Sequence, residues 1–201
     1  MKISSKFFNK SHLKELERYT NTSTYSIHLI SNKNNNVNIY KSLTDEMEII
    51  DEKLLLKTIN SIEKKFDLII ITDLFELTDD IYGVLKSIQS LLTKDGKLLV
   101  TCVNPKWFSI LKIFEKINLK EKTSTSSYIH PKKISNIAKS NSFELNQYYS
   151  RQVFPFNLLG IGSLLNKFFE LLFIALNVGI KNYMVFGNYK NNRKKLSKSI
   201  I

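Results

Sequence analysis

The stretch from Phe66 to Asp80 places the strongest constraint on how this chain folds. Leu68 to Ile71 is an apolar run of mostly β-branched residues, which is typical of a strand buried on both faces of a parallel sheet. The run ends just before Asp73, so a carboxylate is expected at the carboxyl edge of the sheet, where open α/β folds bind ligands. Asp79 and Asp80 precede apolar residues at helical spacing, which predicts a helix with acidic residues at the positive end of its dipole.

The flanking segments continue this alternation of strand and helix. Leu54 to Lys65 predicts a helix that leads into the central strand, and the helix after that strand is expected to run to about Leu92. Thr93 to Gly96 predicts a turn and Lys97 to Val103 a second buried strand, with a right-handed crossover between the two strands. The acidic segment 44–52 predicts no regular structure. The other expected elements are helices at 11–19, 107–117 and 130–139 and strands at 24–30, 37–43, 142–149 and 182–187.

Two isolated residues invite a chemical interpretation that the sequence does not favour. Cys102 is the only cysteine, which excludes an intramolecular disulfide and a cysteine zinc site. Its apolar surroundings predict a buried, inert thiol. In the strand expected at 24–30, Tyr25, Ile27 and Leu29 alternate with polar residues, so His28 is expected to be a partly exposed strand residue.

Composition indicates one globular domain with a basic end. A chain of 201 residues with 43% hydrophobic residues can bury one substantial core, which argues against wholesale disorder. We expect a single α/β domain at 1–190 and a basic tail at 191–201. The net charge of +12 is uneven, because 11 of the 18 acidic residues lie between Asp45 and Asp80 and none follows Glu170. The tail is interpreted as a solvated segment, with contact to anionic lipid or nucleic acid as the alternative.

The segment from Val153 to Ile180 is the most apolar in the chain. Polar residues interrupt it, so it matches a membrane-spanning helix poorly. It predicts either a helix that packs on the sheet or an interfacial helix that lies on a membrane beside the basic tail. The amino terminus lacks the apolar core of a signal peptide, which predicts a cytoplasmic, optionally membrane-peripheral, location.

Three residues outside the central stretch are candidates for ligand contact. Asn104 and Trp107 follow the strand that ends at Val103, at the edge of the sheet that also holds Asp73. His130 precedes Pro131 at the start of an expected helix, where it is interpreted either as a cap or turn residue or as a general base. Asp73 carries the same pair of interpretations, a structural cap or a ligand contact.

From Phe66 onward the chain resembles the second half of a class I S-adenosylmethionine-dependent methyltransferase. The fourth-strand motif of that family, FDxxxxxDxLEH, matches Phe66-Asp67 and Asp73-Leu74, and its KPGGxLxxxxPN motif is similar to Lys94 to Leu98 followed by Asn104-Pro105. Tyr183-Met184-Val185 also resembles a C-terminal family segment. The resemblance implies a Rossmann-like class I methyltransferase sheet that is mostly parallel with an antiparallel C-terminal strand. Its N-terminal part, 1–53, is divergent, and is either truncated or degenerate.

The same resemblance implies a cofactor and a set of site residues. S-adenosylmethionine is the implied cofactor, with Asp73, Leu74 and Phe75 at its pocket. Asn104, Trp107 and His130 are implied on the side of the methyl acceptor, which is a small molecule, a lipid-linked compound or a sugar. No catalytic residue is carried over, because Leu77 stands where the family often has a histidine.

The first third of the chain departs from the family pattern, because no glycine precedes Gly83. Family members carry a glycine-rich loop after their first strand, where glycine lets the backbone approach the cofactor closely. If 24–30 is the first strand, Ser31 to Asn36 replaces that loop. If 24–30 is the second strand, the first strand is missing.

Three functions are therefore compared. The first is methyl transfer. The second is a catalytically inactive, methyltransferase-like binding or regulatory subunit that docks on a protein partner through its N-terminal side. The third is a peripheral membrane protein. Nucleic acid is not favoured as a partner, because the basic residues are not interleaved with aromatic residues in a recognisable module.

Overall fold

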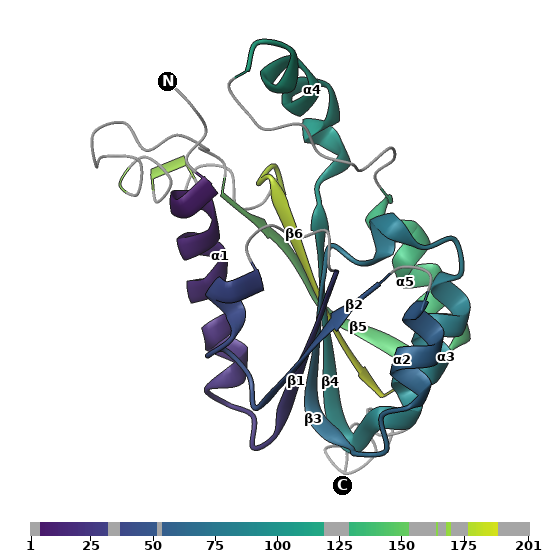
Figure 1. Cartoon of the computed structure of the whole chain (residues 1–201). Helices are drawn as coiled ribbons and strands as arrows, with labels where there is room; N and C mark the ends of the chain where they lie inside the picture. The colour runs from purple at the N-terminus through teal and green to yellow at the C-terminus, as the bar shows by residue number, and fades with distance from the viewer. Residues whose placement is uncertain are drawn as a thin grey trace, which may run out of the picture.

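The computed structural model describes residues 5–31, 37–51, 54–118, 129–152, 164, 168–169 and 177–188. Within these residues the chain forms a six-stranded sheet with helices on both faces (Figure 1). The strands are β1 (Ser26–Ser31), β2 (Glu46–Ile50), β3 (Phe66–Thr72), β4 (Leu92–Val103), β5 (Phe143–Arg151) and β6 (Lys181–Asn188). The helices are α1 (Ser5–Thr20), α2 (Leu55–Asn60), α3 (Ile81–Leu91), α4 (Phe108–Lys116) and α5 (Pro131–Ser140), with short 3-10 turns η1 (Val37–Tyr40), η3 (Phe75–Leu77) and η4 (Pro105–Trp107).

The sheet has the mixed topology that the sequence predicts. The strand order is β2-β1-β3-β4-β6-β5. The first four strands in this order are parallel, whereas β6 is antiparallel to both β4 and β5. The antiparallel C-terminal strand is therefore confirmed, and it inserts between two earlier strands.

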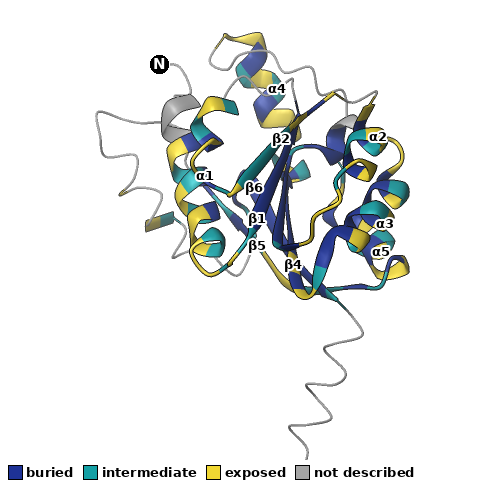
Figure 2. Cartoon of the chain, turned by 60° about the horizontal axis from the view of Figure 1, so that its bottom comes forward, coloured by how far each residue is buried: buried dark blue, intermediate teal, exposed yellow. Residues whose placement is uncertain are grey.

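The central strands are buried on both faces because helices cover both sides of the sheet (Figure 2). On one face, α2, α3 and α5 pack over a large apolar cluster that includes Ile69, Ile71 and Leu98. The helix predicted after β3 is α3, and Asp80 caps it by accepting a 2.8 Å hydrogen bond from the backbone N–H of Gly83.

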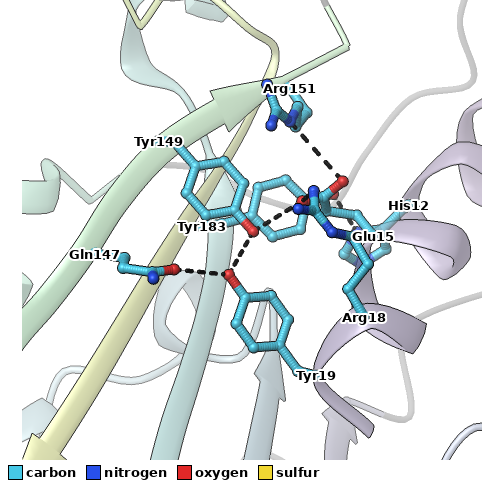
Figure 3. A network of polar contacts seen from close by, with 8 residues as sticks. All are labelled: His12, Glu15, Arg18, Tyr19, Gln147, Tyr149, Arg151 and Tyr183. Atoms are coloured by element: carbon cyan, nitrogen blue, oxygen red, sulfur yellow. Dashed lines mark hydrogen bonds and ion pairs between the residues drawn. The ribbon is translucent and has the colours of Figure 1, made fainter. Parts of the chain in front are cut away.

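Helix α1 covers the opposite face through one buried leucine and a polar network (Figure 3). Leu16 lies fully buried against the sheet. The Tyr19 and Tyr149 hydroxyls are 2.7 Å apart, and the Tyr149 hydroxyl donates to Glu15 at 2.9 Å. Arg151 lies 3.8 Å from the same carboxylate. These contacts hold the first helix against β5, which is distant in sequence.

Four local predictions are wrong. The segment 37–43 forms η1 and a turn instead of a strand, and the second strand is β2 within the acidic segment 44–52. The turn expected at 93–96 is an irregularity inside β4. There the pairing register of β4 with β3 shifts, because Phe66 pairs with Leu92 whereas Leu68 pairs with Lys97. His28 is completely buried instead of partly exposed, because α1 and η1 cover the face on which its ring lies.

Several predicted features lie outside the described residues. These are the loop 32–36, the tail 191–201 and most of the apolar segment Val153 to Ile180. Of the helices that the structure describes, none combines the length and hydropathy needed to cross a bilayer.

The docking of α1 gives the first testable prediction. We expect Leu16→Ala to lower the free energy of unfolding by about 2–5 kcal/mol, because the substitution leaves a cavity between α1 and the sheet. Lys14→Ala, at an exposed position of the same helix, is the control and should change it by less than about 0.5 kcal/mol. Urea unfolding measures both values. Equal, small effects of the two substitutions would show that α1 does not pack as described.

Candidate functional site

The strand order places a topological switch point between β1 and β3. After β1 the chain moves to β2 on one side, and it later returns to pair β3 on the other side of β1. Carboxyl ends of strands at such a point form the usual ligand crevice of open α/β sheets. Strand β1 therefore corresponds to the first strand of the expected methyltransferase-like sheet. Ser31 to Asn36 follows it, at the sequence position where class I methyltransferases have their glycine-rich loop.

Asp73 lies at this switch point, and its position at the carboxyl edge of the sheet is the one that the sequence predicts. Its backbone has φ of 52°, a left-handed conformation that aspartate tolerates better than most residues. Its N–H donates to the carbonyl of Thr101 on β4 at 3.1 Å. Its Oδ2 forms an ion pair with Lys181, whereas Oδ1 is buried without a hydrogen-bond partner among the described residues.

Lys181 is the first residue of β6, and its side chain is only 4% exposed. Because β6 runs antiparallel, its first residue reaches the edge at which the parallel strands end, beside Val103 and Arg151. A buried ammonium group requires a nearby anion, and the Asp73 carboxylate provides it. The carboxyl edge therefore holds one negative group beside the switch point, in contact with one positive group that reaches it from β6.

Two buried histidines lie close enough to this ion pair for the charge of Lys181 to act on them. His28 Nε2 is 2.8 Å from Thr72 Oγ1, and His12 Nδ1 is 2.7 Å from Tyr183 Oη. Both imidazole rings contact the Tyr40 ring, edge-on in each case. Burial and, to a smaller extent, the nearby lysine ammonium lower the pKa of His28 to about 3 and that of His12 well below its usual value. Both rings are therefore neutral near pH 7.

Glu76 brings a second carboxyl group to the same edge. Its Oε1 accepts a 3.0 Å hydrogen bond from the backbone N–H of Val103, and its Oε2 has no partner in the part of the chain that the structure describes. Burial and, to a smaller extent, the negative charge of Asp73 raise the pKa of Glu76 to about 7, against the opposing effect of Lys181. This carboxyl group changes its protonation state close to neutral pH.

Leu74 and Phe75, predicted to line a cofactor pocket beside Asp73, direct their side chains into the core. Both side chains are buried in the apolar cluster beneath α3. Their side chains therefore belong to the core in this structure, and only their backbone adjoins the switch point.

Asn104 and Trp107, predicted on the acceptor side, form contacts that support β6. The Asn104 side-chain amide donates to the carbonyls of Asn177 at 3.1 Å and Gly179 at 2.8 Å. The Trp107 indole N–H donates to the carbonyl of Val178 at 2.6 Å. These bonds fix the segment that leads into Lys181. Trp107 remains partly exposed at the carboxyl edge, whereas Asn104 is buried.

His130 occupies the cap position of α5, one of its two predicted roles. Its Nδ1 accepts a hydrogen bond from the backbone N–H of Lys132 at 3.3 Å, and the residue is exposed. Helix α5 belongs to the face that also carries α2 and α3 (Figure 1). The described residues do not connect His130 to the Asp73 ion pair.

Sequence reasoning missed Lys181, His12, His28 and Glu76. The signal for Lys181 was present, because a lone lysine at the start of a strand of otherwise largely apolar residues points to a buried charge with a partner. His12 carried no such signal, since helix α1 appears amphipathic and charged from its sequence alone.

A cavity of about 290 Å³ opens at the opposite, amino edge of the sheet. It is lined by Tyr19, Thr22, Ser23, Thr24, Asp67, Leu68, Asp95 and Lys97. The strands β3 and β4 begin here, so this cavity is a full strand length from Asp73. Because ligands of open α/β folds bind at the carboxyl edge, we assign the candidate site to the Asp73 side.

Comparison with known proteins supports the fold. No family model matches the sequence, and no curated protein matches it. A SAM-dependent methyltransferase from Archaeoglobus fulgidus matches the structure with a TM-score of 0.55 at 13% identity, over 92% of this chain and 95% of that chain. One from Thermotoga maritima matches with a TM-score of 0.56 at 13% identity, over 92% and 90%.

A third similar structure contains a bound product. The N-methyltransferase NodS from Bradyrhizobium japonicum, in complex with S-adenosylhomocysteine, matches with a TM-score of 0.53 at 9% identity, over 90% of this chain and 87% of that chain. At these identities the likeness establishes the fold. The chain has the Rossmann-like α/β fold of these methyltransferases, which confirms the predicted fold class.

The pKa of Glu76 gives the second prediction. In the unfolded chain this group titrates near 4.5, so between there and about pH 7 the folded protein retains a proton that the unfolded chain releases. Stability is therefore lost as pH rises through this window. Glu76→Gln should remove this loss. As pH rises from about 5 to about 8, the free energy of unfolding of the variant should therefore increase relative to that of the wild type by on the order of 2 kcal/mol. Urea unfolding across this range tests it, and parallel stability curves would contradict it.

Proposed function

We propose that this protein binds S-adenosylmethionine at the carboxyl edge of β1 and β3 and transfers its methyl group to an acceptor. The observation that carries the proposal is the ion pair of Asp73 and Lys181 at the switch point of a sheet shared with known methyltransferases. The pair places two opposite charges where this class of fold receives its ligand.

The two charges fit the amino-acid end of the cofactor. That end carries an ammonium and a carboxylate group, which complement the Asp73 carboxylate and the Lys181 ammonium respectively. Asp73 Oδ1 is buried without a hydrogen-bond partner among the described residues, so a ligand donor that reached it would satisfy it. These side chains offer a means of binding that does not depend on glycine in the segment after β1.

The residues also suit the chemistry of methyl transfer. When bound, S-adenosylmethionine would supply an electrophilic methyl group on a sulfonium centre. Asp73 and Lys181 would orient the ligand, which is the main requirement of such a transfer. Glu76, whose pKa is about 7, would take a proton from an acceptor that must lose one. The acceptor class stays as predicted: a small molecule, a lipid-linked compound or a sugar.

Calorimetric titration of the full chain with two nucleosides tests this proposal. S-adenosylhomocysteine carries the amino-acid end, whereas 5′-methylthioadenosine lacks it. We expect Asp73→Asn and Lys181→Met each to weaken S-adenosylhomocysteine binding about tenfold or more, because a hydrogen bond to a charged group contributes about 1.5–3 kcal/mol. Binding of 5′-methylthioadenosine should change little in either variant.

Lys97→Met is the matched control, because it removes a lysine from the amino edge of the sheet. It should leave the affinity for both nucleosides unchanged. If folded wild-type protein gives no heat with either nucleoside at millimolar concentration, methyl transfer is refuted and the inactive binding or regulatory subunit becomes the better hypothesis. If S-adenosylhomocysteine binds but all variants bind it equally, the ion pair is not the recognition element.

A further inference from the structure

Helix α4 has an apolar side that faces solvent. Ile110 and Ile113 of α4 and Ile117, the cap residue directly after it, follow a spacing of three and four residues, so they lie on one side of the helix. All three are exposed, with Ile113 at 55% and Ile117 at 56%. A surface helix of a globular protein normally directs such a stripe toward the core. In α4 the opposite side, at Leu111 and Glu115, is the buried one.

The charges of this helix are also unevenly placed. Its only acidic residue, Glu115, is buried, and its carboxylate lies 3.2 Å from the Lys112 ammonium. Lys116 is exposed beside the isoleucine stripe. The solvent-facing surface of α4 therefore combines isoleucine side chains with positive charge.

The position of α4 leaves this surface accessible. The helix follows β4 through η4 and projects beyond the carboxyl edge of the sheet, at the top of Figure 1. Its nine residues span about 14 Å, which is too short to cross a bilayer but long enough to lie along one. Figure 2 shows exposed residues on the same projecting helix.

We propose that the Ile110, Ile113 and Ile117 face of α4 docks on the surface of an anionic lipid bilayer. Isoleucines that enter the acyl boundary lose contact with water, and the adjacent Lys116 meets negative headgroups. A second copy of the chain fits less well, because a two-fold contact through this face would place Lys116 near its own counterpart. Nucleic acid would engage Lys116 through phosphate but would leave the isoleucines in water.

This inference does not depend on the proposed methyltransferase activity. Where both hold, the surface lies at the same edge of the sheet as Asp73, so docking would present the candidate site to lipid. That arrangement would favour the lipid-linked class of acceptor.

Flotation of the full chain with vesicles tests the proposal. We expect binding to phosphatidylglycerol-containing vesicles, weaker binding to pure phosphatidylcholine vesicles, and loss of binding as salt rises. The double substitution Ile113→Glu with Ile117→Glu should reduce the bound fraction about tenfold or more, since it removes two apolar anchors and adds charge that anionic lipid repels.

The matched control is Leu54→Glu with Tyr82→Glu. Leu54, just before α2, is 52% exposed, and Tyr82, on α3, is 50% exposed, so both resemble the isoleucines in exposure. Their substitution should leave vesicle binding unchanged. All four positions are exposed, and circular dichroism with a thermal melt verifies that both double variants fold. Equal binding by both variants would overturn the proposal. A second result would also overturn it: the wild-type protein does not bind vesicles, and in sedimentation it forms a dimer that the Ile113/Ile117 double substitution abolishes.

Discussion

The ammonium group of Lys181 requires a counter-charge, because its side chain is almost completely enclosed by protein. Asp73 satisfies this requirement from the end of β3, which β4 separates from β6, with a backbone conformation uncommon outside glycine. Burial keeps His12 and His28 neutral, and the positive charge of Lys181 lowers their pKa values further and opposes the rise in the pKa of Glu76. The charge of this one lysine therefore acts on each of these three groups.

The fold delivers that lysine by inserting a late strand into an early sheet. Strand β6 runs antiparallel between β4 and β5, so its first residue meets the ends of the parallel strands. Asn104 and Trp107 secure the segment before it through three hydrogen bonds to backbone carbonyls. Two residues predicted to touch an acceptor thus support the charged pair.

Much of the fold could be predicted because the buried parallel strands carry their own signal. The apolar runs at Leu68 to Ile71 and Leu98 to Val103 indicate β3 and β4 without any knowledge of their partners. The segment 37–43 shows why the edges were harder. It alternates apolar and polar residues as a strand does, whereas the real β2 is an acidic edge strand whose half-exposed residues give a weak pattern.

The candidate site could be predicted only in part. Asp73 was placed correctly because the end of a buried strand fixes where its next residue lies. The residues that contact one another here are far apart in the sequence. Asp73 and Lys181 are separated by 108 residues, and His12 and Tyr183 are separated by 171 residues. No local pattern encodes such contacts, since they arise only when the strand order is known.

Hydrogen exchange with and without S-adenosylhomocysteine tests the central claim most directly, because it locates the ligand on the sheet. A ligand at the switch point should slow exchange of backbone amides in 68–77 and 177–183, and should leave the amino-edge segments 19–24 and 94–97 unchanged. The reverse pattern, with protection around the cavity at the amino edge and none near Asp73 and Lys181, would contradict the assignment of the site.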